Sequence, residues 1–186
     1  YVLLRKKPPN RPFIMSERRE IALAEHDAKL LLNVLRRRCY CRVLGRIARM
    51  QVGWVPGYGC SDPGLASAWV VQQARRTRAP LYMLFLDLSQ FFPRICRKGL
   101  RIADVAHGLP ESVVAIATAI YGLGPDDPRV SKCRYDSSGG LSGEFKNGVG
   151  CLMGCPLSTD EARIFLNCVV LAIQVAARGV KLWGSC

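Results

Sequence analysis

The stretch LYMLFLDLSQFF at residues 81–92 constrains the fold more than any other part of the chain. Six apolar residues precede Asp87, and two phenylalanines close the stretch. A short apolar run after a proline-containing break is typical of a buried strand in a sheet covered by helices. Burying a carboxylate in such a strand costs several kcal/mol unless a metal ion or a hydrogen-bond donor offsets it. Asp87 is therefore expected to have a ligand or a cap.

The size and charge of the chain indicate one globular domain, or a large piece of one, with a polyanionic partner. Its 186 residues are 49% hydrophobic, and 27 Lys and Arg residues outnumber 14 acids, for a net charge of +13. The excess is concentrated near the start, where residues 1–50 hold thirteen bases and four acids. This favours nucleic acid over a basic face without a specific ligand. The predicted nucleic-acid contacts are Lys6, Lys7, Arg36, Arg37 and Arg38.

Cysteine usage and hydropathy point to an intracellular protein. Nine cysteines, an odd number mostly in apolar context (Cys96, Cys151, Cys155 and Cys168), are typical of reduced, buried thiols. Zinc is not favoured, because the Cys39-x-Cys41 pair has no second pair at ligand spacing. No apolar run of 18 residues and no signal peptide occurs, so we expect a soluble nuclear or cytoplasmic protein without a membrane contact.

The chain reads as a mixed α+β domain. We expect an extended, proline-rich start over residues 1–12, a helix from Ser16 and a loop over 51–64. A hairpin turning at Ser-Gly-Gly is predicted over 129–149. Further helices are predicted over 65–77, 97–107, 111–122 and from Ser158 to Gly179, the last with a Ser158-x-x-Glu161 capping box and an apolar stripe through Ile164, Phe165, Cys168, Leu171 and Val175.

Five segments in order resemble the fingers and palm of reverse transcriptases, most closely those of non-LTR (LINE-type) retrotransposons. They are RPFIMSERREIALAEHDAKLLLNVLRRR, QVGWVPGYGCSD, LYMLFLDLSQFF, GLP followed by IYG, and FKNGVGCLMGCPLSTDEARIFLN. The resemblance covers nearly the whole chain. It implies a right-hand polymerase fragment with helices packed on a small antiparallel sheet and a hairpin. Residues 1–80 would be a basic fingers-like region and residues 81–186 a partial palm without the thumb.

By the same resemblance, several positions acquire roles. Asp87 matches a catalytic, metal-binding aspartate, and the Leu88 carbonyl would assist it in holding Mg²⁺ or Mn²⁺. Phe92 matches the aromatic residue that disfavours a 2′-hydroxyl, with core packing as the plainer interpretation. The remaining matches to nucleotide-binding positions are Arg11, for which a solvated side chain is the alternative, and Gly154, Cys155, Pro156 and Asn167. The implied partners are an RNA template, a DNA primer and a dNTP.

The chain also departs from the family pattern. Leu152-Met153 replaces Arg-Gln, and two acids, Asp160 and Glu161, stand where apolar residues would pack. Pro93 occupies a position that usually holds a second aspartate. The Tyr/Phe-x-Asp-Asp hairpin, expected shortly after GVKLWG, does not occur before Cys186, and Asp126-Asp127 is predicted to be an exposed turn because prolines flank it.

Three functions are consistent with this sequence. The first is a piece of a reverse transcriptase that synthesises DNA from RNA by two-metal nucleotidyl transfer in the complete protein. The second is a degenerate, non-catalytic nucleic-acid-binding or structural protein derived from such an enzyme. The third is a subunit whose open sheet edge docks on a protein partner.

Overall fold

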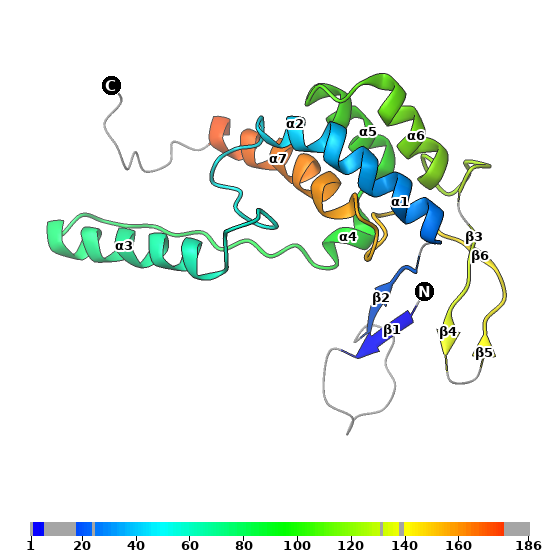
Figure 1. Ribbon diagram of the computed structural model, residues 1–186. Helices are drawn as coiled ribbons and strands as arrows, with labels where there is room; N and C mark the ends of the chain where they lie inside the picture. The colour runs from blue at the N-terminus through cyan, green and yellow to red at the C-terminus, as the bar shows by residue number, and fades with distance from the viewer. Residues whose placement is uncertain (1, 6–17, 24, 131, 138–139, 177–186) are drawn as a thin grey trace.

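The computed structural model of the chain describes residues 2–5, 18–23, 25–130, 132–137 and 140–176 (Figure 1). A body of helices lies beside two small groups of short strands, which confirms the α+β class. One sheet has the strand order β2-β1-β4-β5, and the other pairs β3 with β6.

The first hairpin replaces the expected start of a helix. Strands β1 (Val2–Arg5) and β2 (Arg18–Ile21) pair antiparallel, with Val2 opposite Ile21 and Arg5 opposite Arg18. The prediction of a helix from Ser16 was therefore wrong for residues 18–21, because pairing with β1 satisfies their backbone groups in a strand. Ser16 itself lies outside the described residues, and helix α1 (His26–Leu35) begins later.

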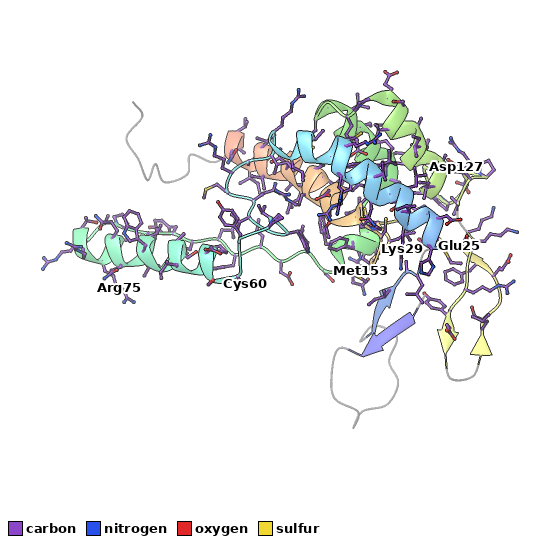
Figure 2. The ribbon with its side chains drawn as sticks, viewed as in Figure 1. Glu25, Lys29, Cys60, Arg75, Asp127 and Met153 are labelled. Carbon is purple, nitrogen blue, oxygen red and sulfur yellow. The ribbon has the colours of Figure 1, made fainter. Side chains whose placement is uncertain are left out.

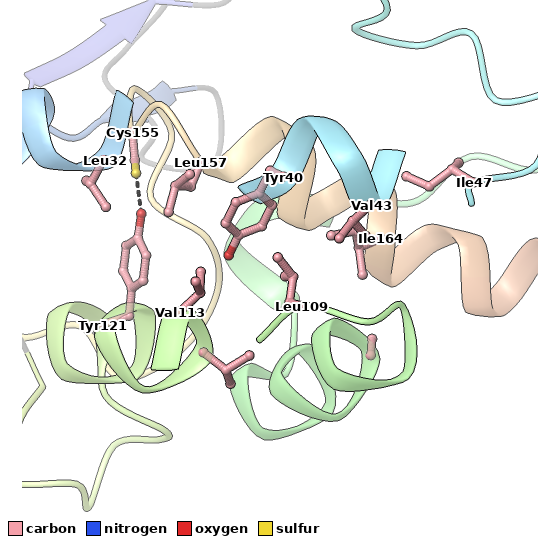
Figure 3. Packing of buried hydrophobic residues seen from close by; sticks show 12 residues of the cluster. Leu32, Tyr40, Val43, Ile47, Leu109, Val113, Tyr121, Cys155, Leu157 and Ile164 are labelled. Atoms are coloured by element: carbon pink, nitrogen blue, oxygen red, sulfur yellow. Dashed lines mark hydrogen bonds between the residues drawn. The ribbon is translucent and has the colours of Figure 1, made fainter. Parts of the chain in front are cut away.

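A continuous helical segment follows and supplies one wall of the core. Helix α1 passes through a π-helical turn, η2 (Arg36–Tyr40), into α2 (Cys41–Leu44). Figure 3 shows the buried side chains of this segment meeting those of the other helices. The main core cluster includes Leu32, Tyr40, Val43, Ile47, Leu109, Val113, Tyr121, Leu157 and Ile164.

Two predicted helices are confirmed nearly to the residue. Helix α5 (Arg97–Ala106) and helix α6 (Glu111–Tyr121) match the expected ranges 97–107 and 111–122. Gly108 lies between them with a φ of 85°, a left-handed value that glycine adopts without strain. Pro110 caps the start of α6.

The predicted hairpin over residues 129–149 is also confirmed. Strands β3 (Lys132–Cys133) and β6 (Phe145–Lys146) pair antiparallel, and beyond them β4 (Asp136–Ser137) pairs with β5 (Gly140–Leu141). The tip at residues 138–139 lies outside the described residues. Strand β4 also pairs parallel with β1, which joins the β1–β2 hairpin and the β4–β5 hairpin in one sheet.

Helix α7 (Ser158–Ala176) forms where expected, but its capping box does not. Ser158 Oγ donates a hydrogen bond to the Leu152 carbonyl at 2.7 Å, and Glu161 points to Arg101 instead of to the helix start. Of the expected apolar stripe, Ile164 is buried and Phe165 half-buried, whereas Cys168, Leu171 and Val175 are exposed. The stripe is wrong beyond Asn167 because no described element covers that part of the helix. The expected stop at Gly179 lies outside the described residues.

Helix α3 (Ser61–Thr77) stands apart from the helical body in Figure 1. It begins four residues before the predicted range of 65–77, where the Asp62 carboxylate accepts a hydrogen bond from the Gly59 amide at 2.6 Å. None of its residues is buried. Figure 2 labels Cys60 and Arg75 near its two ends and shows its side chains directed outward.

The described cysteines are free thiols, as expected. Cys151 and Cys155 are buried in the core, which agrees with the prediction. Cys96 and Cys168 are exposed, contrary to it, because each lies on a helix end or face that no described element covers.

Candidate functional site

The segment that carries Asp87 is not a buried strand, so this prediction was wrong. Residues 79–88 have no regular secondary structure, and both Asp87 and Leu88 are exposed. A strand requires a neighbour for its backbone hydrogen bonds, and neither sheet of the described residues includes this segment. Asp87 therefore carries no burial cost here, and its carboxylate faces solvent.

Asp87 lines a shallow cavity of about 290 Å³ at the start of α4 (Phe91–Arg94). Leu88 lines the same cavity. A carboxylate and a backbone carbonyl are oxygen donors of the kind that Mg²⁺ and Mn²⁺ prefer, and Mg²⁺ sites in proteins often use only one or two carboxylates. Asp87 and Leu88 thus fit part of a metal shell. Within the described ranges, no group of three or more His, Cys, Asp or Glu side chains is placed to hold a metal.

Phe92 is half-buried in a cluster of aromatic rings. The Trp54 ring meets it edge to face with centroids 5.4 Å apart, and the Phe91 ring lies 5.8 Å away. The Phe92 carbonyl accepts a hydrogen bond from the Cys151 amide at 2.8 Å. These contacts fit the packing interpretation of Phe92, while contact with a nucleotide sugar stays a prediction. The contacts with Trp54 and Cys151 also place loop 51–60 and the turn over residues 150–157 next to Phe92.

Gly154 approaches the backbone of the chain itself. Its φ is 99°, and a Cβ added there would lie 2.7 Å from the Ala22 carbonyl oxygen. The Ala22 amide donates a hydrogen bond to the Met153 carbonyl at 2.6 Å, which fixes the turn against the end of β2 (Figure 2 labels Met153). The space that glycine opens is therefore occupied by the β2–α1 connection.

The two residues after Gly154 differ in their exposure. The Cys155 thiol is buried against the Tyr121 hydroxyl, to which it is hydrogen-bonded (Figure 3). Burial raises the pKa of the Cys155 thiol above its usual value, so the group is a protonated thiol at neutral pH. Pro156 is half-buried at the start of α7. Of this pair, Pro156 is the one with surface open to a ligand.

Asn167 serves as a polar link between three elements. Its side chain is fully buried, and its Oδ1 accepts hydrogen bonds from the Ala48 amide at 3.0 Å and from Gln51 Nε2 at 3.2 Å. Its Nδ2 lies 2.9 Å from His107 Nε2. These bonds occupy both ends of the amide, so any influence of Asn167 on a nucleotide would act through the position of α7.

The predicted basic contacts fall into three groups. Lys6, Lys7 and Arg11 lie outside the described residues. Arg36 is drawn inward, where its Nε lies 2.6 Å from the buried Asp160 carboxylate. Arg37 and Arg38 are exposed on η2, where solvent or a phosphate can reach them.

Sequence reasoning missed a buried cluster of charges beneath the 150–157 turn. Arg101 bridges two carboxylates, with its Nη1 2.8 Å from Asp104 and its Nη2 2.7 Å from Glu161. The Tyr40 hydroxyl and the Cys151 thiol also face Glu161. The available signal was the spacing of Arg101 and Asp104, three residues apart in a helix, combined with acids in the apolar pattern of α7.

This cluster contains more acidic than basic groups, and this imbalance determines which acid keeps a proton. Burial and then the charge of Glu161 raise the pKa of Asp104 to about 8, although the Arg101 guanidinium opposes the shift. Burial alone would lower the pKa of Arg101, but Glu161 and Asp104 outweigh it and raise that pKa further. Asp104 therefore keeps a proton at neutral pH.

Asp126 and Asp127 lie in a turn between α6 and β3. Asp126 is exposed, as predicted, whereas the side chain of Asp127 is largely covered. Asp127 caps this turn, since its carboxylate accepts hydrogen bonds from the Leu123 amide and from Arg129. Its bonds to Arg129 hold the pKa of Asp127 well below the usual range. The carboxylate of Asp127 is thus committed to the local fold.

No model of a known protein family matches this chain, and the search of curated proteins finds no relative. None of the helices described by the structure is both long and apolar enough to cross a membrane.

Proposed function

We propose that this chain is the fingers and N-terminal palm of a reverse transcriptase domain of the non-LTR type. In the complete protein, that domain would copy RNA into DNA. The observation that carries the proposal is a convergence in space. Trp54, Phe92 and Cys151 come from three of the five sequence segments that resemble the family, and they meet through a ring contact and a backbone hydrogen bond. Segments that act on one nucleotide must lie together in this way.

The candidate site of this domain is the surface between Asp87, Phe92 and the 150–157 turn. Asp87 and the Leu88 carbonyl would hold Mg²⁺ or Mn²⁺, which supplies activation of the primer hydroxyl and stabilisation of the leaving pyrophosphate when bound. Phe92 is fixed by its aromatic neighbours, so its position relative to a sugar would be rigid. Pro156, which has open surface, would form the opposite wall.

Template and primer would contact the basic face of the chain. Arg37 and Arg38 are exposed neighbours on η2, and the chain as a whole carries a net charge of +13. Phosphate contacts of this kind supply most of the sequence-independent affinity for nucleic acid and make it depend on salt.

Titration of the chain with an RNA–DNA template–primer at several salt concentrations tests the binding part of the proposal. Replacing Arg37 and Arg38 together with alanine should weaken binding and reduce the salt slope by about 1–2. The matched control is the double alanine variant of Arg75 and Arg76, two exposed arginines on α3. Binding that does not respond to salt, or an equal loss in both double variants, would contradict this assignment.

The catalytic part depends on the coding sequence that follows residue 186. A two-metal site that includes Asp87 needs further carboxylates. The proposal therefore requires an Asp-Asp pair in a hairpin, encoded within about the next 30 codons. In the protein extended through that pair, Asp87→Asn should abolish Mg²⁺-dependent DNA synthesis and leave template–primer binding in place. A downstream sequence without such a pair would overturn the polymerase proposal.

A non-catalytic protein derived from a reverse transcriptase is the second candidate. The observation in its favour is Leu152-Met153, which replaces polar side chains of the family with apolar ones beside the proposed nucleotide surface. The acids of α7 do not add to this case, because Asp160 and Glu161 are buried in ion pairs with Arg36 and Arg101 and serve the fold. This candidate predicts that Asp87→Asn leaves binding unchanged or slightly stronger, and that the extended protein is inactive even with Asp87 intact.

A further inference from the structure

Three cavities adjoin one another on the side of the molecule that carries Asp87. The first, of about 290 Å³, is the one that Asp87 lines. It shares Arg94 with a larger cavity of about 770 Å³ between the start of α5 and the turn over residues 123–129. The larger cavity in turn shares Val149 with a third, of about 320 Å³, which Phe145 of β6 lines. Because neighbouring cavities share wall residues, together they form one groove, which we call the hairpin groove.

Buried hydrogen bonds hold the floor of the hairpin groove in place. The Gly150 amide donates a hydrogen bond to the Ile95 carbonyl at 3.0 Å. Arg97 is buried, and its guanidinium donates to the carbonyls of Gly150 at 2.9 Å and Val149 at 3.2 Å. These bonds fix residues 149–150 against the start of α5. The groove is therefore formed before a ligand binds, which lowers the entropy cost of binding.

The walls of the hairpin groove carry positive charge where a ligand can reach it. Beyond Asp87, the charged residues that line the two other cavities are Arg94, Arg97, Lys98, Arg129 and Lys146 against Asp126 and Asp127. Asp127 and Arg129 neutralise each other in an ion pair at 2.8 Å. Arg94, Lys98 and Lys146 are exposed, and the exposed acid among these residues is Asp126. An excess of open positive charge along a groove fits a chain of phosphates.

The third cavity combines this charge with two aromatic rings. The rings of Tyr135 and Phe145 stack with centroids 4.8 Å apart and planes 20° apart, and both residues line the cavity. Lys146, which lines it as well, follows Phe145 directly. Proteins that bind single-stranded nucleic acid combine aromatic side chains for the nucleobases with a positively charged groove for the backbone. A nucleobase within a duplex is covered by its neighbours, so an unpaired one fits this cavity.

We propose that the hairpin groove binds the unpaired part of an RNA template, with one nucleobase in the cavity beside Tyr135 and Phe145. This inference rests on the proposed function and extends it. Where a template is copied, the primer is paired with it, so the strand that stays unpaired next to the site is the template. The groove begins at the cavity of Asp87, and its exposed basic residues line the path from there to the two rings.

Fluorescence anisotropy with a labelled single-stranded RNA and with a blunt RNA–DNA duplex tests the phosphate contacts. Replacing Lys98 and Lys146 together with alanine should reduce the salt slope for the single strand by about 1.4, since each contact contributes about 0.7. Extrapolated from about 1 M salt, this is roughly a 25-fold loss of affinity at about 0.1 M salt. Duplex binding should stay close to wild type. The control is the double alanine variant of Arg75 and Arg76, which removes the same charge from α3 and should retain single-strand binding.

A fully abasic strand, which keeps its phosphates and lacks nucleobases, tests the aromatic cavity. The wild-type chain should bind it about tenfold more weakly than the intact RNA, because a nucleobase stacked on an aromatic ring contributes on that order. Tyr135→Leu should lose most of this preference. Tyr58→Leu is the matched control, because Tyr58 is exposed in loop 51–60 and should keep the preference. The lysine variant changes exposed positions, so its result does not depend on the packing of the Tyr135 ring.

Four results would overturn the proposal: equal losses in the two double variants, equal losses for single strand and duplex, tighter binding of single-stranded DNA than of RNA, or an unchanged preference for intact RNA in Tyr135→Leu. A chain that binds the template–primer duplex but not the single strand would also overturn it, while leaving the proposed function in place. A downstream sequence without an Asp-Asp pair would overturn the polymerase proposal without changing these titrations, so the two failures are distinguishable.

Discussion

Replacing Asp104 with asparagine should remove most of the pH dependence of folding stability between pH 5 and pH 8. Asp104 is fully buried, and its pKa rises from 3.8 to about 8 on burial beside Glu161. Within this window the folded chain binds a proton that the unfolded chain has released. The free energy of unfolding of the wild type should therefore fall as pH rises, and level off above the folded pKa.

The size of the effect follows from the shift. One pKa unit corresponds to 1.36 kcal/mol, so the wild type should lose on the order of 1 kcal/mol per pH unit and about 4 kcal/mol at most between pH 5 and pH 8. Asparagine cannot ionise, but its amide oxygen can accept the hydrogen bond that Arg101 now donates to the carboxyl group. The variant should match the wild type near pH 5 and be clearly more stable at pH 8.

Urea unfolding monitored by circular dichroism at pH 5, 6, 7 and 8 measures this difference. Asp126→Asn is the control, because Asp126 is exposed in a turn and should leave the wild-type slope unchanged. The titratable groups that face the cluster, Glu161, Tyr40 and Cys151, are the same in all three proteins. Parallel curves for the wild type and Asp104→Asn would mean that Asp104 is ionised in the folded chain, and the explanation of the cluster would fail.

Two further substitutions examine the 150–157 turn and α7. Gly154→Ala should destabilise the fold by about 1–3 kcal/mol, because its Cβ would meet the Ala22 carbonyl at a positive φ, whereas Gly143→Ala has open space and should be close to neutral in the same unfolding assay. Asn167→Ala should cost about 1–3 kcal/mol, since it leaves the Ala48 amide without its acceptor, and an unchanged unfolding midpoint would show that water replaces the amide.

Local signals in the sequence were enough for some elements and not for others. Helices α5 and α6 were predictable because Gly108 and Pro110 mark their ends and the apolar periodicity between them is strong. The hairpin over 129–149 was predictable from its turn residues. The prediction of a strand within residues 81–92 was wrong. The apolar pattern is typical of a segment that can form a strand, but a strand also needs a neighbouring strand, and neither described sheet supplies one.

The site was harder to predict than the fold. Gly154 was singled out by resemblance as a nucleotide-binding position, and the backbone that it approaches in the fold is that of Ala22, 132 residues earlier in the chain. Asn167 was singled out by resemblance, and its hydrogen bonds to Ala48, Gln51 and His107 depend on tertiary packing that no local pattern contains. The partners of Arg101 were missed for the same reason.

The ion pairs of Arg36 with Asp160 and of Arg101 with Glu161 make four positions interdependent. Losing either arginine leaves an uncompensated buried carboxylate, which is far more damaging than replacing both members of the pair with apolar residues. In evolution, substitutions at both members of a pair should therefore be accepted more readily than a substitution at one member alone. Among relatives of this chain, acids at positions 160 and 161 should occur only with arginine or lysine at positions 36 and 101, so these pairs should covary and mark the lineage in which they arose.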